Sequence, residues 1–292
     1  MLSQLSAVVL PVLLVAGIGF TWAKMGRRFD SVFLTDIVTN IGTPCLVAHS
    51  LTTLKISPAA LAQMGIAVLA AVAGFLVLGL VTLRLMKLSP NSYLPALTFP
   101  NTGNMGLPLA LFAFGQEGLG LAVVYFGCTV TLQFTLGISL SAGNLSLSRL
   151  VRTPAIYAVA ISIAMLVLKI QPPAWIDNTI GVLGGLTIPM MLLTLGVSLA
   201  QLKVTALRRN LFLACVRLAG GFLIALLVVR LFDLPPMAAG VLIVQSSMPV
   251  AVFNFLFAQY YGRAHGDVAA MVVISTAISF VTLPLLAYYV LR

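Results

Sequence analysis

Long apolar stretches make up most of the chain, and only short polar segments separate them. A helix that crosses a hydrocarbon core about 30 Å thick needs about 20 mostly apolar residues. Ten stretches meet this requirement: 5–23, 32–50, 60–84, 92–114, 118–140, 153–169, 177–200, 208–230, 236–260 and 267–291. They lack the short alternating pattern of membrane barrel strands. The pattern therefore predicts an all-α integral membrane protein with ten transmembrane helices.

Composition leads to the same class. Of the 292 residues, 61% are hydrophobic and 8% are charged, whereas soluble domains contain about 25% charged residues. So few charges cannot cover a soluble surface, which excludes a soluble enzyme, a disordered chain and a nucleic-acid-binding domain despite the net charge of +10. The three cysteines lie in apolar stretches without paired spacing, and no catalytic set such as HExxH occurs. We therefore expect no disulfide framework, metal site, cofactor or enzymatic activity.

Basic residues lie mostly on one side of the ten predicted spans. Eleven follow the odd-numbered spans: Lys24, Arg27, Arg28, Arg84, Lys87, Arg149, Arg152, Lys203, Arg208, Arg209 and Arg263. The opposite side has Lys55, Lys169, Arg230 and Arg292. Since cytoplasmic loops carry the excess of Lys and Arg, we predict a multi-pass protein of the cell membrane, surrounded by lipid. The loop 141–152 would be cytoplasmic and both termini would lie outside.

The two halves of the chain repeat the same pattern of spans. An offset of 145 residues superimposes each of the first five spans on one of the last five, and Pro44 then falls on Pro189. Five spans per half give the halves opposite orientations, and inverted repeats of this kind are typical of secondary transporters. We therefore predict inverted repeats at 1–145 and 146–292; fortuitous spacing of ten similar helices is the alternative.

The fourth and ninth spans are interrupted by polar residues and prolines. The residues that break the helices are Pro100, Gly103, Pro108 and Pro249. The candidate substrate-binding residues at the breaks carry amides or hydroxyls: Asn101, Thr102, Asn104, Gln245, Ser246, Ser247 and Asn254. Each break exposes the N-terminus of a second half-helix, whose free N–H groups attract anions. We predict an anion site there; kinked helices whose asparagines bond to neighbouring helices are the alternative.

Acidic residues occur only at or near the ends of the predicted spans: Asp30, Asp36, Glu117, Asp177, Asp233 and Asp267. With no carboxylate near either break, the site is neutral to positive, which suits an anionic substrate. A proton antiporter of the paired-aspartate type would need buried carboxylates. Sodium coupling stays open, because carbonyl and hydroxyl oxygens can bind sodium.

At both breaks the sequence resembles the auxin efflux carrier family, which includes the plant PIN-type carriers and bacterial malate/malonate-permease-like proteins. The motifs are Pro100-Asn101-Thr102, Met105-Gly106-Leu107-Pro108-Leu109 and Ile243-Val244-Gln245-Ser246-Ser247-Met248-Pro249. Pro44 with His49 is similar to the second helix of the family.

The resemblance implies that spans four and nine unwind and cross at mid-membrane, where Asn101 matches the position that holds the substrate carboxylate. Spans one, two, six and seven would form a scaffold that dimerises into a homodimer. Spans three to five and eight to ten would form a transport domain that moves as an elevator. Two departures matter: the central loop is short, and 60–83 lacks the charged pair of plant members. Auxin is therefore one candidate among small organic anions.

Two further residues have open roles. Arg217, in the eighth span, either takes part in function or satisfies backbone carbonyls of the transport domain. His49 either lines the substrate path or caps the second helix. The sequence as a whole predicts a secondary transporter of small organic anions, with export as the expected direction. A sodium-coupled symporter of the bile-acid-carrier type and an anion channel are the alternatives.

Overall fold

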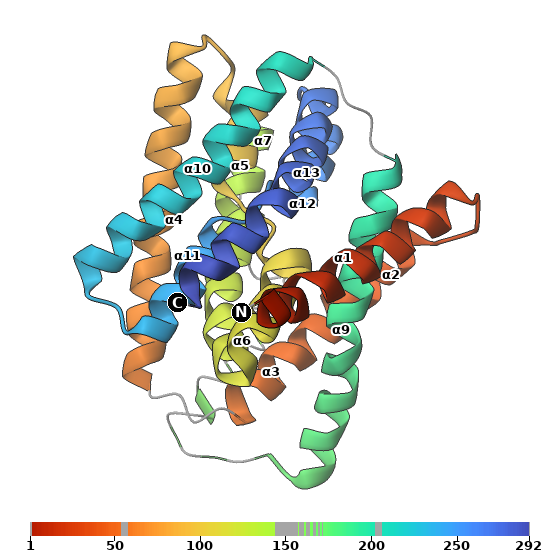
Figure 1. Ribbon diagram of the computed structural model, residues 1–292, viewed down its shortest axis with the longest axis vertical. Helices are drawn as coiled ribbons and strands as arrows, with labels where there is room; N and C mark the ends of the chain where they lie inside the picture. Colours follow the sequence, from red (N-terminus) through yellow and green to blue (C-terminus); the bar gives the residue numbers. More distant parts are fainter. Residues whose placement is uncertain are drawn as a thin grey trace.

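A computed structural model of the protein describes residues 2–53, 58–143, 172–201 and 206–291, together with positions 157, 161, 164, 165, 168 and 170. The first half contains α1 (Leu2–Lys24), α2 (Ser31–Ile37), the π-helix η1 (Val38–Gly42), α3 (Thr43–Thr53), α4 (Pro58–Leu85), α5 (Pro90–Thr98), the π-helix η2 (Thr102–Gly106), α6 (Leu107–Leu132), the π-helix η3 (Gln133–Gly137) and α7 (Ile138–Ala142). The second half contains α9 (Ala174–Gln201), α10 (Leu207–Phe232), α11 (Pro236–Ser246), α12 (Val252–Tyr260) and α13 (His265–Val290) (Figure 1).

These helices coincide with nine of the ten predicted stretches, and most of the tenth, 153–169, lies outside the described residues. Among the described residues, five helices are long and apolar enough to cross a membrane: Ala59–Leu85, Thr102–Ala142, Ala174–Gln201, Leu207–Phe232 and His265–Val290. The helical, multi-pass character of the described part of the chain is therefore confirmed. The ten-span inverted repeat stays a prediction.

A glycine divides the longest of these helices. Within the 41 residues of Thr102–Ala142, Gly115 has φ 66° and ψ −159°, which no helical residue adopts. A positive φ of this kind has little steric cost for glycine because it has no Cβ. The change of direction falls between the predicted stretches 92–114 and 118–140.

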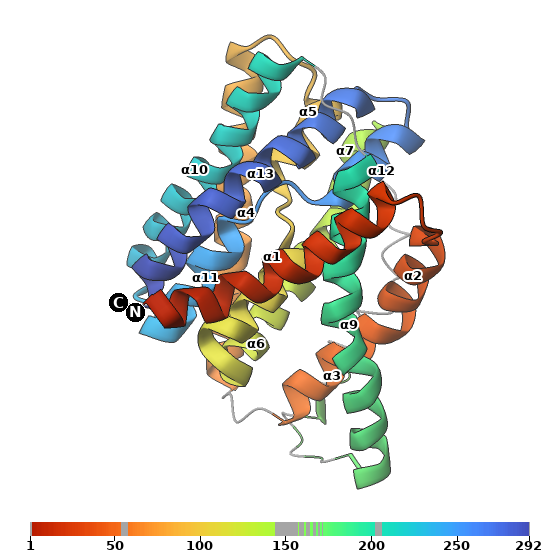
Figure 2. The same ribbon diagram turned by 45° about the vertical axis from the view of Figure 1, so that its right-hand side comes forward.

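The helices pack in two groups, with α6 between them (Figures 1 and 2). In one group, α9 packs along α1 and α3. In the other group, α10 packs on α4, α11 and α13, and α5 packs on α4. The backbones of α1 and α9 are in direct contact, because a Cβ added at Gly196 would overlap the carbonyl oxygen of Ala16.

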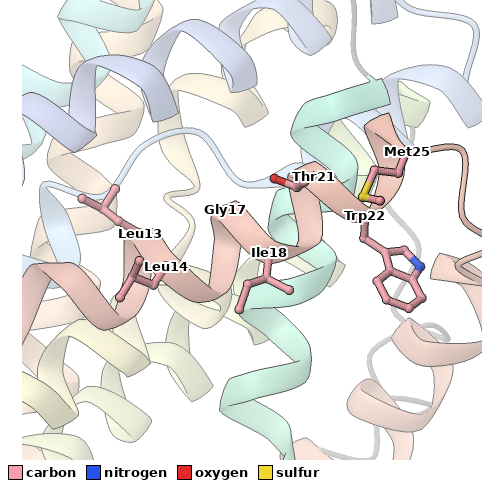
Figure 3. Close-up of a pocket in the computed structure, with 7 residues that line it drawn as sticks. All are labelled: Leu13, Leu14, Gly17, Ile18, Thr21, Trp22 and Met25. Carbon is pink, nitrogen blue, oxygen red and sulfur yellow. The ribbon is translucent and has the colours of Figure 1, made fainter.

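A shallow groove of about 470 Å³ follows the surface of α1 (Figure 3). Its lining residues are Leu13, Leu14, Gly17, Ile18, Thr21, Trp22 and Met25. They come from α1 and, for Met25, from the residue directly after it, and Thr21 has the only hydroxyl among them. An apolar groove of this kind offers nothing to hold an anion, and it suits lipid chains or another apolar helix.

The predicted topology depends on the loop 141–152, most of which, including Ser148, lies outside the described residues. We expect a cysteine at Ser148 to react only with reagent that reaches the cytoplasm, and a cysteine at the C-terminus to react with an impermeant reagent from outside. The native cysteines should be replaced first, because Cys215 is exposed. Labelling at Ser148 from outside would reverse the topology.

Candidate substrate site at the helix crossing

The two interrupted helices meet backbone to backbone. Pro100 and Val250 form an antiparallel bridge. The Asn101 N–H donates to the Pro249 carbonyl over 2.7 Å, and the Ala251 N–H donates to the Phe99 carbonyl over 3.3 Å. Proline has no N–H to donate, so Pro100 and Pro249 fit this pairing without leaving a donor unsatisfied. The breaks that follow α5 and α11 therefore lie against each other.

Asn101 caps the half-helix that begins at the first break. Its Oδ1 accepts a hydrogen bond from the Asn104 N–H over 3.3 Å, and its backbone has φ −77° and ψ 63°. The residue is 4% exposed, and its Nδ2 has no hydrogen-bond partner. The cap thus uses the acceptor of this side chain and leaves its donor available.

Gln245, in the last turn of α11, is a second buried amide without partners. The residue is 0% exposed, and neither Oε1 nor Nε2 has a hydrogen-bond partner. A Cβ added at Gly106 would overlap Gln245 Oε1, so the amide lies directly against the backbone of η2. An unpaired buried polar group costs about 1–3 kcal/mol. Two such amides therefore lie beside one half-helix, with polar atoms that no protein group satisfies.

The hydroxyls of the three predicted site residues Thr102, Ser246 and Ser247 already have partners. Thr102 Oγ1 lies 3.3 Å from Thr129 Oγ1, and Ser246 Oγ lies 3.0 Å from the Tyr125 hydroxyl. Ser247 Oγ donates to the Ile243 carbonyl over 2.7 Å. Thr102 and Ser246 therefore attach both breaks to α6, while Ser247 closes the last turn of α11.

Asn254 links three elements. Its Nδ2 donates to the Phe99 carbonyl over 3.0 Å, and its Oδ1 accepts from Gln133 Nε2 over 2.9 Å. The half-helix α12 is thereby tied to the first break and to η3. Both polar atoms of the Asn254 amide thus have partners within the protein, whereas Nδ2 of Asn101 and both polar atoms of Gln245 have none.

The remaining predicted site residues have different surroundings. Asn104 lies in η2 and is partly buried, and a Cβ at the adjacent Gly103 would come within 3.0 Å of the Phe126 ring. Pro108 lies in the first turn of α6, directly after η2, so the helix continues through it. The wider π turn gives the proline ring room where an α turn would bring it against a carbonyl. His49 lies on α3, with its Nδ1 3.0 Å from Asp177 Oδ1 of α9.

Arg217 of α10 lies behind the crossing and is 2% exposed. Its guanidinium donates to the carbonyls of Leu97 (3.0 Å), Met248 (3.4 Å) and Ser246. The group also lies 4.4 Å from the centre of the Phe75 ring. Of the two roles left open by the sequence, the contacts match the binding of carbonyls, and these carbonyls belong to both interrupted helices.

A polar cluster that the sequence analysis missed joins α5, α10 and α13. Asp267 accepts from the Tyr93 hydroxyl over 2.6 Å and from Asn210 Nδ2 over 3.1 Å, and it pairs with Arg209. The sequence placed Asp267 only at a span end, because nothing in its pattern connects it with residue 93. Within the described residues, no group of three His, Cys, Asp or Glu side chains could hold a metal ion.

The known proteins that are similar to this chain are described as transporters. A family model described as a membrane transport protein matches residues 138–287, just over half of the chain. An uncharacterized transporter of Methanocaldococcus jannaschii is 25% identical over 205 residues, which are 66% of this chain and 66% of the relative. An uncharacterized transporter of Methanothermobacter thermautotrophicus is 28% identical over 204 residues, which are 63% of each chain. The alignments thus cover slightly less than two thirds of either relative. The family match confirms the resemblance found in the motifs, and the chain belongs to the membrane transport protein family, which includes the auxin efflux carriers, as a transporter and not an enzyme.

Proposed function

We propose that the protein is a secondary transporter of small organic anions, and that the crossing binds the carboxylate of the substrate. The observation that supports this most is the pair of buried amides without partners, Asn101 and Gln245. Asn101 Nδ2 can donate to a carboxylate oxygen, and the Gln245 Nε2 offers a second donor. Hydrogen bonds to a charged group are worth about 1.5–3 kcal/mol each.

The ends of the half-helices add to this attraction. A half-helix begins at Thr102 and another begins at Val252, the latter without a side-chain cap. The first N–H groups of a helix have no partner within it, and the N-terminus carries about half a positive charge. An anion can therefore be attracted to the crossing without a basic side chain, and auxin-like or malate/malonate-like carboxylates are the substrate class that we propose.

We infer an elevator mechanism with ten spans in two inverted repeats. The group formed by α1, α2, α3 and α9, together with the sixth span, would be the scaffold that forms a homodimer. The group formed by α4, α5, α10, α11, α12 and α13, together with α6 and α7, would be the moving transport domain. The packing of the helices in two groups supports this division, and the family resemblance supports the movement.

We expect a membrane potential to drive transport of the anionic substrate without a coupling ion. The potential acts on a monoanion with about 2.3 kcal/mol per 100 mV, which corresponds to an accumulation of about 50-fold. Proteoliposomes with equal pH and equal sodium on both sides, and a clamped inside-positive potential, should therefore accumulate the carboxylate. Liposomes without protein measure the leak. In a cell whose inside is negative, the same force favours export.

The same liposomes separate the alternatives. Saturable uptake that is accelerated by unlabelled substrate on the opposite side supports a carrier, whereas uptake proportional to concentration without this acceleration indicates a channel. Uptake that ignores the potential and follows a sodium gradient would contradict the proposal and favour a symporter of the bile-acid-carrier type.

A further inference from the structure

Three backbone carbonyls converge on one position behind the crossing. The Leu97 carbonyl belongs to the last turn of α5, the Ser246 carbonyl to the last residue of α11, and the Met248 carbonyl to the second break. The last carbonyls of a helix have no partner within it, and the C-terminus of a helix carries about half a negative charge. Two C-termini that meet at one position therefore attract about one positive charge.

Backbone carbonyls at broken helices are the groups that coordinate sodium in ion-coupled carriers. In this protein, the position is filled by the guanidinium of Arg217. A guanidinium keeps its charge and offers five donors in a fixed plane, so one group can bond several carbonyls at once. The Phe75 ring lies 4.4 Å from it and adds a further favourable contact for a cation.

A glycine of α10 gives the guanidinium access to this position. A Cβ added at Gly221 would overlap the Ser246 carbonyl oxygen and would come within 3.1 Å of Arg217 Nη2. The close approach of α10 to the end of α11 thus depends on the absence of a side chain. Helix α10 and the end of α11 are thus packed closely around the guanidinium of Arg217.

Carboxylates do not balance the charge of Arg217. Among the described residues, which include all six acidic ones, no carboxylate forms an ion pair with Arg217. The positive charge of Arg217 is therefore offset by the two helix ends themselves. A carboxylate partner would instead indicate an ordinary structural ion pair.

We propose that Arg217 acts as a tethered coupling cation: its guanidinium occupies a carbonyl-lined cation site between α5 and α11 and makes anion transport independent of sodium. This proposal rests on the proposed function, because it names the coupling mode of the same carrier. Arg217 is a positioning residue that holds both interrupted helices, and it makes no contact with the anion in this scheme.

The stability of the full-length protein tests the proposal without any organic anion. Thermal unfolding is measured in choline chloride, with part of the choline replaced by sodium or by millimolar guanidinium at constant ionic strength. We expect the Tm of the wild type to be the same in all three salts. Arg217→Ala should have a lower Tm that rises by several degrees, with saturation, when guanidinium or sodium fills the vacated site. Arg230→Ala is the matched control, because Arg230 is exposed on the same helix.

Two results would overturn the proposal: a wild-type Tm that rises saturably with sodium, or an Arg217→Ala protein that responds to neither cation. If Arg217→Ala does not fold, the same measurement on Arg217→Lys decides whether the proposal holds. Its ammonium retains the charge but cannot bond three carbonyls in a plane, so we expect a lower Tm that is still independent of sodium. A sodium requirement in Arg217→Lys would count against the proposal. Because no substrate is present, these outcomes do not depend on whether carboxylates are transported.

Discussion

Replacing Asn101 by alanine should weaken substrate binding roughly 10- to 150-fold and abolish transport at substrate concentrations that suffice for the wild type. The variant loses the free Nδ2 donor, and a hydrogen bond to a charged group is worth about 1.5–3 kcal/mol. A panel of small carboxylates first identifies a ligand that raises the Tm of the wild type. The affinity of that ligand is then measured for the variant from the same shift.

Asn101→Asp is the second variant, and it separates the loss of the donor from the loss of the helix cap. The aspartate keeps an oxygen that can accept from the Asn104 N–H, so the cap of the half-helix is retained. It replaces the free donor by a negatively charged oxygen, which repels an anion. We expect the Tm without ligand to fall in Asn101→Ala by the loss of the cap but to change less in Asn101→Asp, while both lose binding. Wild-type affinity in either variant would remove Asn101 from the site.

Replacing Gly196 by alanine should destabilise the protein strongly, because the new methyl group would overlap the Ala16 carbonyl oxygen and come within 2.7 Å of the Phe20 nitrogen. Both are backbone atoms, which cannot turn aside as a side chain can. Overpacking of this kind costs about 1–3 kcal/mol or more, so we expect a Tm lower by about 2–10 °C. The measurement is thermal unfolding of the purified protein in detergent.

Gly185 is the matched control for this experiment. It lies on the same helix, α9, and a Cβ at this position would have no heavy atom within 4 Å. Alanine favours a helix over glycine by about 1 kcal/mol, so Gly185→Ala should leave the Tm unchanged or raise it. If both variants behave alike, the backbones of α1 and α9 are not in the contact described above.

The helices and the two breaks could be predicted from the sequence because their signals are local. The length of each apolar stretch sets each span, and Pro100 and Pro249 interrupt helices by their own chemistry. The repeat itself stays a prediction. Elements α4, α5 and η2 begin at residues 58, 90 and 102, and α10, α11 and α12 begin at 207, 236 and 252. These three pairs of starts differ by 149, 146 and 150 residues, close to the predicted offset of 145.

Which polar side chains form hydrogen bonds within the protein and which keep unpaired atoms could not be predicted, since this depends on contacts between distant segments. Asn254 and Asn101 are both amides at a break, yet the amide of Asn254 is hydrogen-bonded to the Phe99 carbonyl and to the Gln133 amide. Pro108 was expected to break its helix, and the π turn before it keeps the helix continuous. The partners of Arg217 belong to residues 97, 246 and 248, which sequence spacing does not bring together.

In the proposed carrier, the position of Arg217 would also determine which step of the transport cycle depends on the membrane voltage. The residue lies on α10 and bonds carbonyls of α5 and of the break after α11, so its charge would move together with these helices. At the helix crossing, a bound monoanion would compensate the formal charge of Arg217, whereas the crossing without substrate would carry that formal charge alone. The electric field would therefore act mainly on the return of the empty carrier. An inside-negative potential would hold the empty domain toward the cytoplasm, where an anion would be loaded for export.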